Sequence, residues 1–222
     1  LLTFTEQMEK LLDSLNFERI LEIWQKLAYP AKRSLATWLD NLVKRIDQLS
    51  SWKDDPMSIP KITKVNMLFN PQSFLTAIKQ YAKKGDLNKL MIATEFTKKT
   101  MEEIDTPAPK DGVYCYGFLL EGARWDWQLG QIEDARPKEM FSVMPVCLCR
   151  AVQIPATERE DKTLYPCPVY RTEDRGATYI FTAQLKTSLK NPVRKWILGG
   201  VAVILDVEGV SDEAKKETKE AK

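Results

Sequence analysis

The sequence predicts an α+β fold, in which an N-terminal helical layer over residues 1–105 precedes a mostly antiparallel β-sheet over residues 106–210. Three observations predict it. Apolar residues recur with helical spacing before residue 105, they alternate with polar residues after it, and Pro107 and Pro109 lie where the pattern changes. Residues 211–222 contain no apolar side chain larger than alanine, so we expect a charged, disordered tail.

Four apolar stripes with helical spacing predict the helices of the first part. The first two, in residues 8–15 and 20–27, come before the chain-breaking pair Tyr29-Pro30. The third follows Ser34, whose hydroxyl suits an N-cap because it can accept a hydrogen bond from a free N–H group of the first turn. This stripe is the broadest, so we assign its helix to the internal core; its residues are Leu35, Trp38, Leu39, Leu42, Val43, Ile46 and Leu49.

The fourth helix has the clearest start signal in the sequence. Asn70 offers a capping amide, and Pro71 suits the first helical position because that position needs no N–H group. Gly85 is expected to end this helix in a left-handed cap. The apolar run at Leu90–Phe96 then predicts a first strand, which we expect to join the later sheet although it precedes the linker.

Beyond the linker, alternating or continuous apolar runs predict five strands. The two runs that are apolar on both faces, Val113–Leu120 and Trp196–Leu205, are expected to be central strands. Gly199 and Gly200 lie within the last run, where we expect a bulge or a close backbone approach. The predicted strands are Val113–Leu120, Phe141–Val152, Val169–Thr172, Thr178–Lys186 and Lys195–Val207.

Composition excludes several classes of function. The net charge of the 222 residues is only +2, which argues against a nucleic-acid or acidic membrane surface as partner. No apolar run reaches the ~18–20 residues of a membrane span. The sequence contains no histidine and no glycine-rich phosphate loop, so Ser–His or Cys–His catalysis and nucleotide binding of that kind are excluded. Because the chain begins at Leu1, we expect a piece of a longer polypeptide.

The four cysteines do not form a recognisable metal or redox motif. Cys115, Cys147, Cys149 and Cys167 contain no Cys-x-x-Cys pair. Cys147 and Cys149 would share one face of a strand, and free cysteine packs well in protein cores. We therefore predict buried thiols in a reducing compartment and no metal site.

The stretch from Tyr116 to Gln128 is the one candidate for a catalytic site. Glu121 and Asp126 would serve as acid and base, and Arg124 would hold an anion. The competing interpretation is a structural corner, in which Arg124 pairs with Glu121 or Asp126, Gly122 makes the turn, and two tryptophans at 125 and 127 cover the sheet edge. Charges are common at strand ends, so we favour the corner and predict no catalytic or cofactor-binding residue.

Five separated motifs extend the prediction from structure to function. Their order and spacing resemble the C-terminal region of dynein heavy chains over nearly all of residues 20–207, and "TYIFTAQLKT" is more similar to axonemal outer-arm chains. Cys115 and Tyr116 stand where many relatives have a histidine, and the tail after Val210 is longer than the family usually carries. The motifs are "IWQKLAYPAKRSLATWLDNLVKRIDQLSSW", "LFNPQSFLTAIKQYAKK", "DGVYCYGFLLEGARWD", "YPCPVYRT" and "WILGGVAVIL".

The resemblance implies a helical part followed by an incomplete β-barrel, packed across one face of a ring of AAA+ modules. ATP would be hydrolysed in that ring, and microtubules would be bound at a distant stalk, in the axoneme of a cilium or flagellum. The chain would thus be a structural and regulatory module without a cofactor, whose partners are the ring and possible dynein-associated chains. The alternative is a β-barrel ligand-binding module or small enzyme that uses Glu121, Arg124 and Asp126. We expect residues 1–27 to face the ring.

Overall fold

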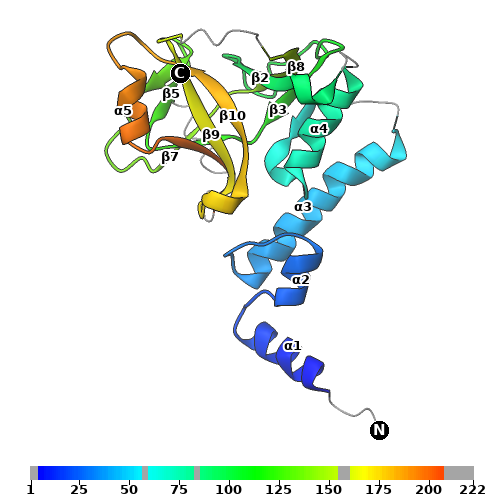
Figure 1. The fold of residues 1–222 in the computed structure, drawn as a ribbon. Coiled ribbons are helices and arrows are strands. Elements are labelled where there is room, and N and C mark those ends of the chain that lie inside the picture. Colours follow the sequence, from blue (N-terminus) through cyan, green and yellow to red (C-terminus); the bar gives the residue numbers. More distant parts are fainter. Residues whose placement is uncertain (1–4, 57–59, 83–85, 155–160, 208–222) are drawn as a thin grey trace. The chain divides into compact units, whose positions relative to one another are not determined.

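The computed structural model describes residues 5–56, 60–82, 86–154 and 161–207 (Figure 1). The chain divides into two compact units, Leu1–Ile59 and Pro60–Lys222, which we call the helical unit and the sheet unit. This division precedes residue 105, where the periodicity changes, because helix α4 and strand β2 belong to the sheet unit. The predicted cap Gly85 and the predicted tail lie outside the described residues.

The helical unit contains α1 (Glu6–Asn16), α2 (Glu22–Leu27) and α3 (Leu35–Asp54). The predicted cap of α3 is confirmed, because the Ser34 side chain accepts a hydrogen bond from the backbone N–H of Thr37. The segment from Trp52 to Pro60, with its two prolines, predicts a loop, but the helix continues to Asp54 and ends two residues before Pro56.

A polar and aromatic cluster forms the centre of this unit. Tyr29, which follows the predicted break between the second and third helices, is fully buried and stacks on Trp38 with ring centroids 5.4 Å apart. Its hydroxyl donates to Asn41 Oδ1 at 2.8 Å, and Arg45 Nε donates to the same oxygen at 2.7 Å. The Arg45 guanidinium also lies 3.9 Å from the centroid of the Tyr29 ring, so the buried cation faces an aromatic π-system.

This cluster corrects in part the prediction that the broad apolar stripe of α3 packs into the core, because Leu35 and Trp38 are the stripe residues that are fully buried. The buried residues of the helix are Leu35, Trp38, Asn41 and Arg45, at spacings of three and four residues. The large apolar side chains Leu39, Val43 and Ile46 point to another side and are exposed. The sequence pattern alone did not reveal this, because an arginine and an asparagine are expected outside a core.

The sheet unit begins with β1 (Ile62–Lys64), the 3-10 turn η1 (Val65–Met67) and α4 (Pro71–Tyr81). The start signal of α4 is confirmed, because Asn70 Oδ1 accepts from the backbone N–H of Ser73 at 3.0 Å and Pro71 opens the helix. The helix packs on β2 and β8. Strand β2 (Leu90–Phe96) has the predicted bounds, and it follows the turn η2 (Leu87–Lys89).

The strands form three sheets. A four-stranded sheet has the order β1-β3-β8-β2, a five-stranded sheet has the order β10-β9-β11-β4-β7, and β5 pairs with β6. Of the described strand pairs, β1/β3 and β9/β11 are parallel and the others are antiparallel, which confirms the mostly antiparallel α+β fold. An isolated bridge between Ile132 and Thr187 is also parallel. Within the described residues the sheets do not close into a barrel. The remaining strands are β3 (Gly112–Tyr116), β4 (Leu119–Glu121), β5 (Arg124–Asp126), β6 (Gln131–Glu133), β7 (Phe141–Val143), β8 (Cys147–Gln153), β9 (Leu164–Thr172), β10 (Tyr179–Lys186) and β11 (Ala202–Asp206).

The first strand predicted beyond the linker is in fact two strands. The run breaks at Gly117, which has φ 101° and lies against the Asn66 side chain. β3 belongs to the four-stranded sheet and β4 to the five-stranded sheet, so Gly117 carries the backbone from one sheet to the other. The predicted strand Phe141–Val152 divides in the same way, into β7 and β8.

Strand β9 begins at Leu164, earlier than predicted. The sequence did not indicate its first half, because that half contains two prolines. Pro166 and Pro168 cannot donate to a ladder, and such residues usually argue against a central strand. β9 pairs with β10 along Leu164–Tyr170, whereas its paired positions on β11 start only at Val169. The prolines therefore lie where β9 has one neighbour instead of two.

The last predicted strand is wrong in its first half. Residues Val193–Leu198 form helix α5, and only Ala202–Asp206 form β11. Gly200, with φ 63°, follows the helix end at Gly199, so the glycine pair makes a turn and not a strand bulge. A short apolar run does not distinguish a strand from a helix by periodicity. The burial of the side chains agrees with a helix that packs through one face: Trp196 is buried, whereas its neighbours Ile197 and Leu198 are exposed.

Candidate functional site: the corner at residues 121–126

The corner is a turn between two sheets. β4 ends at Glu121 in the five-stranded sheet, and β5 begins at Arg124 in the two-stranded sheet. Gly122, which lies between them, has φ 77°, a conformation that residues with a Cβ atom rarely adopt. The predicted role of this glycine as the turn residue is therefore confirmed.

Glu121 forms an ion pair with a residue that sequence reasoning did not identify. Its Oε2 atom accepts from the guanidinium of Arg175 at 2.8 Å. Arg175 also donates from Nη1 to the backbone carbonyl of Gly200 at 2.9 Å. The arginine thus joins the end of β4, the β9–β10 connection and the turn after α5. We call this arrangement the Arg175 clamp.

Arg175 has an unusual backbone, with φ 52° in a residue other than glycine. It precedes the turn η3 (Gly176–Thr178), whose Thr178 N–H donates to the Arg175 carbonyl at 3.0 Å. The positive φ costs free energy, and the two side-chain hydrogen bonds help to offset it. No local signal marks the residue, since it lies 54 positions after Glu121.

Asp126 is used locally. One of its carboxylate oxygens accepts from the backbone N–H groups of Gln128 and Leu129, both at 2.8 Å. This is the arrangement in which an aspartate closes the turn that follows it. The carboxylate therefore holds the β5–β6 connection and faces its own backbone.

Arg124 does not join the two carboxylates. In the described part of the chain it forms no ion pair with Glu121 or Asp126, and its position in the ladder is opposite Glu133. The interpretation of Arg124 as the bridging residue is thus wrong, because each carboxylate is held by another group: Glu121 pairs with Arg175, and Asp126 accepts from backbone N–H groups. An ion pair does hold the corner, but the arginine in it is Arg175 and not Arg124.

Trp125 is the residue that the corner directs inward. It is 2% exposed, and its ring lies 5.5 Å from that of Phe96 on β2 and thus connects two sheets. Its backbone N–H donates to Ser142 Oγ at 3.2 Å. Trp127 is half-buried. The geometry offers no shared proton between Glu121 and Asp126, since each has its own structural partner, and it supports a fold corner better than an acid–base site.

The four cysteines are free and buried, as predicted. Within the described ranges, no group of three or more His, Cys, Asp or Glu side chains is arranged to hold a metal ion. None of the described helices has the length and apolar character that a membrane crossing requires.

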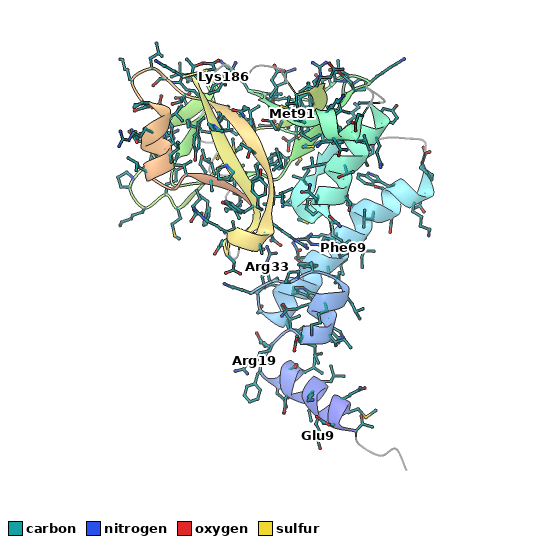
Figure 2. The ribbon with its side chains drawn as sticks, in the orientation of Figure 1. Glu9, Arg19, Arg33, Phe69, Met91 and Lys186 are labelled. Atoms are coloured by element: carbon teal, nitrogen blue, oxygen red, sulfur yellow. The ribbon has the colours of Figure 1, made fainter. Side chains whose placement is uncertain are left out.

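The helical unit presents apolar side chains that its own core does not use. Every described residue of α1 is exposed or half-buried, including Leu12 and Leu15 (Figure 2, where Glu9 marks this helix). On α3, Val43 is 56% exposed, and it shares a face with Leu39 and Ile46 at helical spacing. Large exposed apolar faces of this kind usually mark the place of a missing partner. In the described part of this unit, the other large apolar side chains that are exposed are Met8, Phe17, Ile23 and Leu27.

Comparison with known proteins decides the family. The profile of the C-terminal domain of dynein heavy chains matches residues 1–205. This protein belongs to that family. The dynein C-terminal domain described here is 46% identical over 209 residues to the dynein beta chain of the flagellar outer arm of Chlamydomonas reinhardtii. It is 44% identical to dynein axonemal heavy chain 17 of Mus musculus and 41% identical to the ciliary dynein beta chain of Tripneustes gratilla.

The dynein C-terminal domain is a small part of these relatives. Each of the three alignments covers 93% of this chain but only 4% of the relative. The family assignment and the axonemal character of the relatives confirm what the sequence motifs predicted.

Proposed function

We propose that this protein is the C-terminal structural and regulatory module of an axonemal dynein heavy chain, and that it docks on the AAA+ ring of that same polypeptide. The ring would hydrolyse ATP and drive movement along microtubules, which the heavy chain would contact only through a distant stalk. The module would act in the cytoskeleton of a cilium or flagellum. Other dynein chains are possible further partners.

The observation that carries this proposal is the unused apolar surface of the helical unit. A free-standing domain would bury side chains such as Leu12, Val43 and Leu27, the last of which is 81% exposed. Burial of each large aliphatic side chain stabilises a complex by about 1.5–3 kcal/mol. Several such side chains on three helices suit a lasting interface with a partner, and the rest of the heavy chain is always present at high effective concentration.

The surface proposed for docking differs in one respect from the expectation based on sequence. Residues 1–27 remain part of it, but the outer face of α3 joins them, with Leu39, Val43 and Ile46 as its apolar residues. A packed interface changes by discrete shifts, so a module held there can resist or transmit a motion of the ring. This is the physical basis of the proposed regulatory role.

The docking proposal is tested in the intact heavy chain by Val43→Lys. A lysine at the centre of an apolar interface should weaken docking and change the ATPase rate and the microtubule gliding velocity. The matched control is Thr37→Lys, an exposed position of the same helix that lies about 120° around its axis from Val43. Unchanged activity of Val43→Lys, or an equal effect of both variants, would contradict docking through α3.

The direction of the regulatory effect is tested by deletion. Removing residues 1–210 from the intact motor should alter the velocity or the ATPase rate if the module transmits ring motion. A motor with unaltered kinetics and thermal stability would exclude both the regulatory and the stabilising role.

We also propose that this module has no catalytic site of its own. Glu121 and Asp126 are each held by structural partners, so the alternative of a ligand-binding barrel or small enzyme with Glu121, Arg124 and Asp126 has no supporting geometry. Isothermal titration calorimetry of the 222-residue protein with Mg-ATP should give no saturable heat. Micromolar binding would refute the proposal.

A further inference from the structure

Three of the four cysteines form a cluster inside the four-stranded sheet. Cys115 lies on β3, and Cys147 and Cys149 lie on β8; all three are free and fully buried. Cys115 is directly opposite Cys147 in the antiparallel ladder. Cys149 is two residues further along β8, so its side chain emerges on the same face. The Sγ atoms of Cys147 and Cys149 are 3.9 Å apart.

The three thiols influence one another, and Cys149 takes part in each of the hydrogen bonds between them. Cys115 Sγ also donates to the Val113 carbonyl at 3.8 Å. Hydrogen bonding with Cys115 and Cys147 lowers the pKa of the Cys149 thiol. The pKa of Cys115 is raised by its bond to Cys149 and by burial, and the pKa of Cys147 is raised by burial and by its bond to Cys149. The Cys149 thiol thus interacts with both of the other two.

We propose that Cys115 and Cys147 are an oxidisable pair, which a peroxide converts into a disulfide across β3 and β8, and that Cys149 positions the two sulfurs. One sulfur attacks the peroxide, the O–O bond breaks, and a sulfenic acid and a molecule of water form. The second sulfur then attacks the sulfenic sulfur and releases another water that carries the remaining thiol proton. The two thiols lose two electrons, and the peroxide is reduced.

Strand geometry selects this pair. Residues directly opposite in an antiparallel ladder have Cβ atoms roughly 4.5–5.5 Å apart, and a disulfide needs about 3.5–4.5 Å, a small adjustment. Cys147 and Cys149 follow each other on one extended strand, where two residues span roughly 6.6 Å. That separation is close to the upper limit of the Cα–Cα distance in disulfides. A bond between Cys115 and Cys147 is therefore the less strained product.

Burial determines when the reaction occurs. The thiolate is the reactive form, and solvent does not reach these sulfurs in the closed sheet. Oxidation therefore requires a local opening between β3 and β8, and the new bond joins the two strands after they close again. The disulfide would therefore form only in molecules whose sheet opens in the presence of peroxide. Once formed, it would hold β3 and β8 together.

The fourth cysteine provides an internal control. Cys167 on β9 is as deeply buried as the others, but its sulfur contacts the backbone carbonyls of Pro168 and Val201. Burial raises the pKa of this thiol. Cys167 therefore tests whether a cysteine is oxidised because it becomes exposed from a buried site or because it belongs to the thiol cluster.

The experiment exposes the 222-residue protein to hydrogen peroxide, with and without urea below the unfolding transition. Free thiols are then alkylated, and non-reduced peptides are identified by mass spectrometry. We expect the loss of two thiols per molecule, a peptide link between Cys115 and Cys147, faster formation in urea, and an alkylated Cys167. Links that include Cys167 at equal yield, links between molecules, or singly oxidised cysteines without a link would overturn the proposal.

Substitutions separate the roles of the three residues. Cys147→Ser should abolish the link, whereas Cys167→Ser should leave it unchanged; circular dichroism confirms that each variant is folded. Cys149→Ala should slow the formation of the link without changing which residues it joins. An unchanged rate in Cys149→Ala would contradict the proposed positioning role of Cys149. The proposed disulfide itself is tested separately, by the peptide link in the unsubstituted protein.

Discussion

Single residues show how the charges at the corner are arranged. Glu121 and Arg175 form an ion pair at 2.8 Å in which both side chains are about one-third exposed, and Arg175 also donates to the Gly200 carbonyl. Arg124, the residue that the sequence suggested for this role, is half-buried and lies opposite Glu133. The clamp connects three segments of the polypeptide, so it should contribute to the stability of the sheet unit.

The two arginines make a matched pair of variants. Arg175→Ala should lower the free energy of unfolding by about 1–2 kcal/mol, because it removes two charge-assisted hydrogen bonds in a partly solvated site. Arg124→Ala should cost less than about 1 kcal/mol, because the half-buried Arg124 forms no ion pair with Glu121 or Asp126 in the described part of the chain. Urea denaturation of the 222-residue protein measures both. An equal loss in the two variants would show that the clamp has no special role.

At the level of elements, the connection between β3 and β4 depends on Gly117. The residue has φ 101°, and an added Cβ would collide with the Asn66 side chain. The backbone passes from one sheet to the other at this position. If β3 continued past Gly117, the apolar residues of β4 would stay in the four-stranded sheet and not reach the five-stranded one. A glycine with positive φ also lies at the next change of sheet, since Gly122 joins β4 to β5.

Gly117→Ala should be much more destabilising than a comparable change elsewhere. We expect a loss of about 2–4 kcal/mol, from the backbone strain and from displacement of Asn66. Gly176→Ala is the control: its φ is 53°, but no atom lies within 4 Å of the added Cβ. It should cost only about 1 kcal/mol. Thermal unfolding followed by circular dichroism compares them; similar midpoints would contradict a role for the Asn66 contact.

At the scale of the whole molecule, the helical unit is unevenly stabilised. α3 packs through Leu35 and Trp38 and through the buried Arg45, which is 1% exposed. α1 has no buried residue of its own. The two helices therefore differ in the tertiary contacts that oppose local opening.

Hydrogen exchange should reveal this difference. In the 222-residue protein, backbone amides of residues 6–16 should exchange faster than those of residues 35–49, because most helical stability comes from packing and not from propensity. Exchange measured by mass spectrometry of peptides provides the comparison. In the intact heavy chain, α1 should gain protection if it docks on the ring. Strong and equal protection of both helices in the free protein would contradict this prediction.

The sequence by itself determined what depends on a few neighbouring residues. The caps Ser34 and Asn70, the strand Leu90–Phe96 and the α+β order follow from local hydrogen-bond donors, fixed backbone angles and periodicity. Five motifs in their order were enough to indicate the family. None of these features requires knowledge of which distant segments meet.

Only the tertiary structure decided the features that depend on such meetings. It replaced Arg124 by Arg175 as the partner of Glu121, and it divided the apolar run after the linker at Gly117. It also buried Arg45 in the helical unit and brought Cys115 opposite Cys147. The physical reason is common to all of them: burial, charge pairing and ladder register are properties of contacts between segments far apart in the sequence, and no local pattern records the partner.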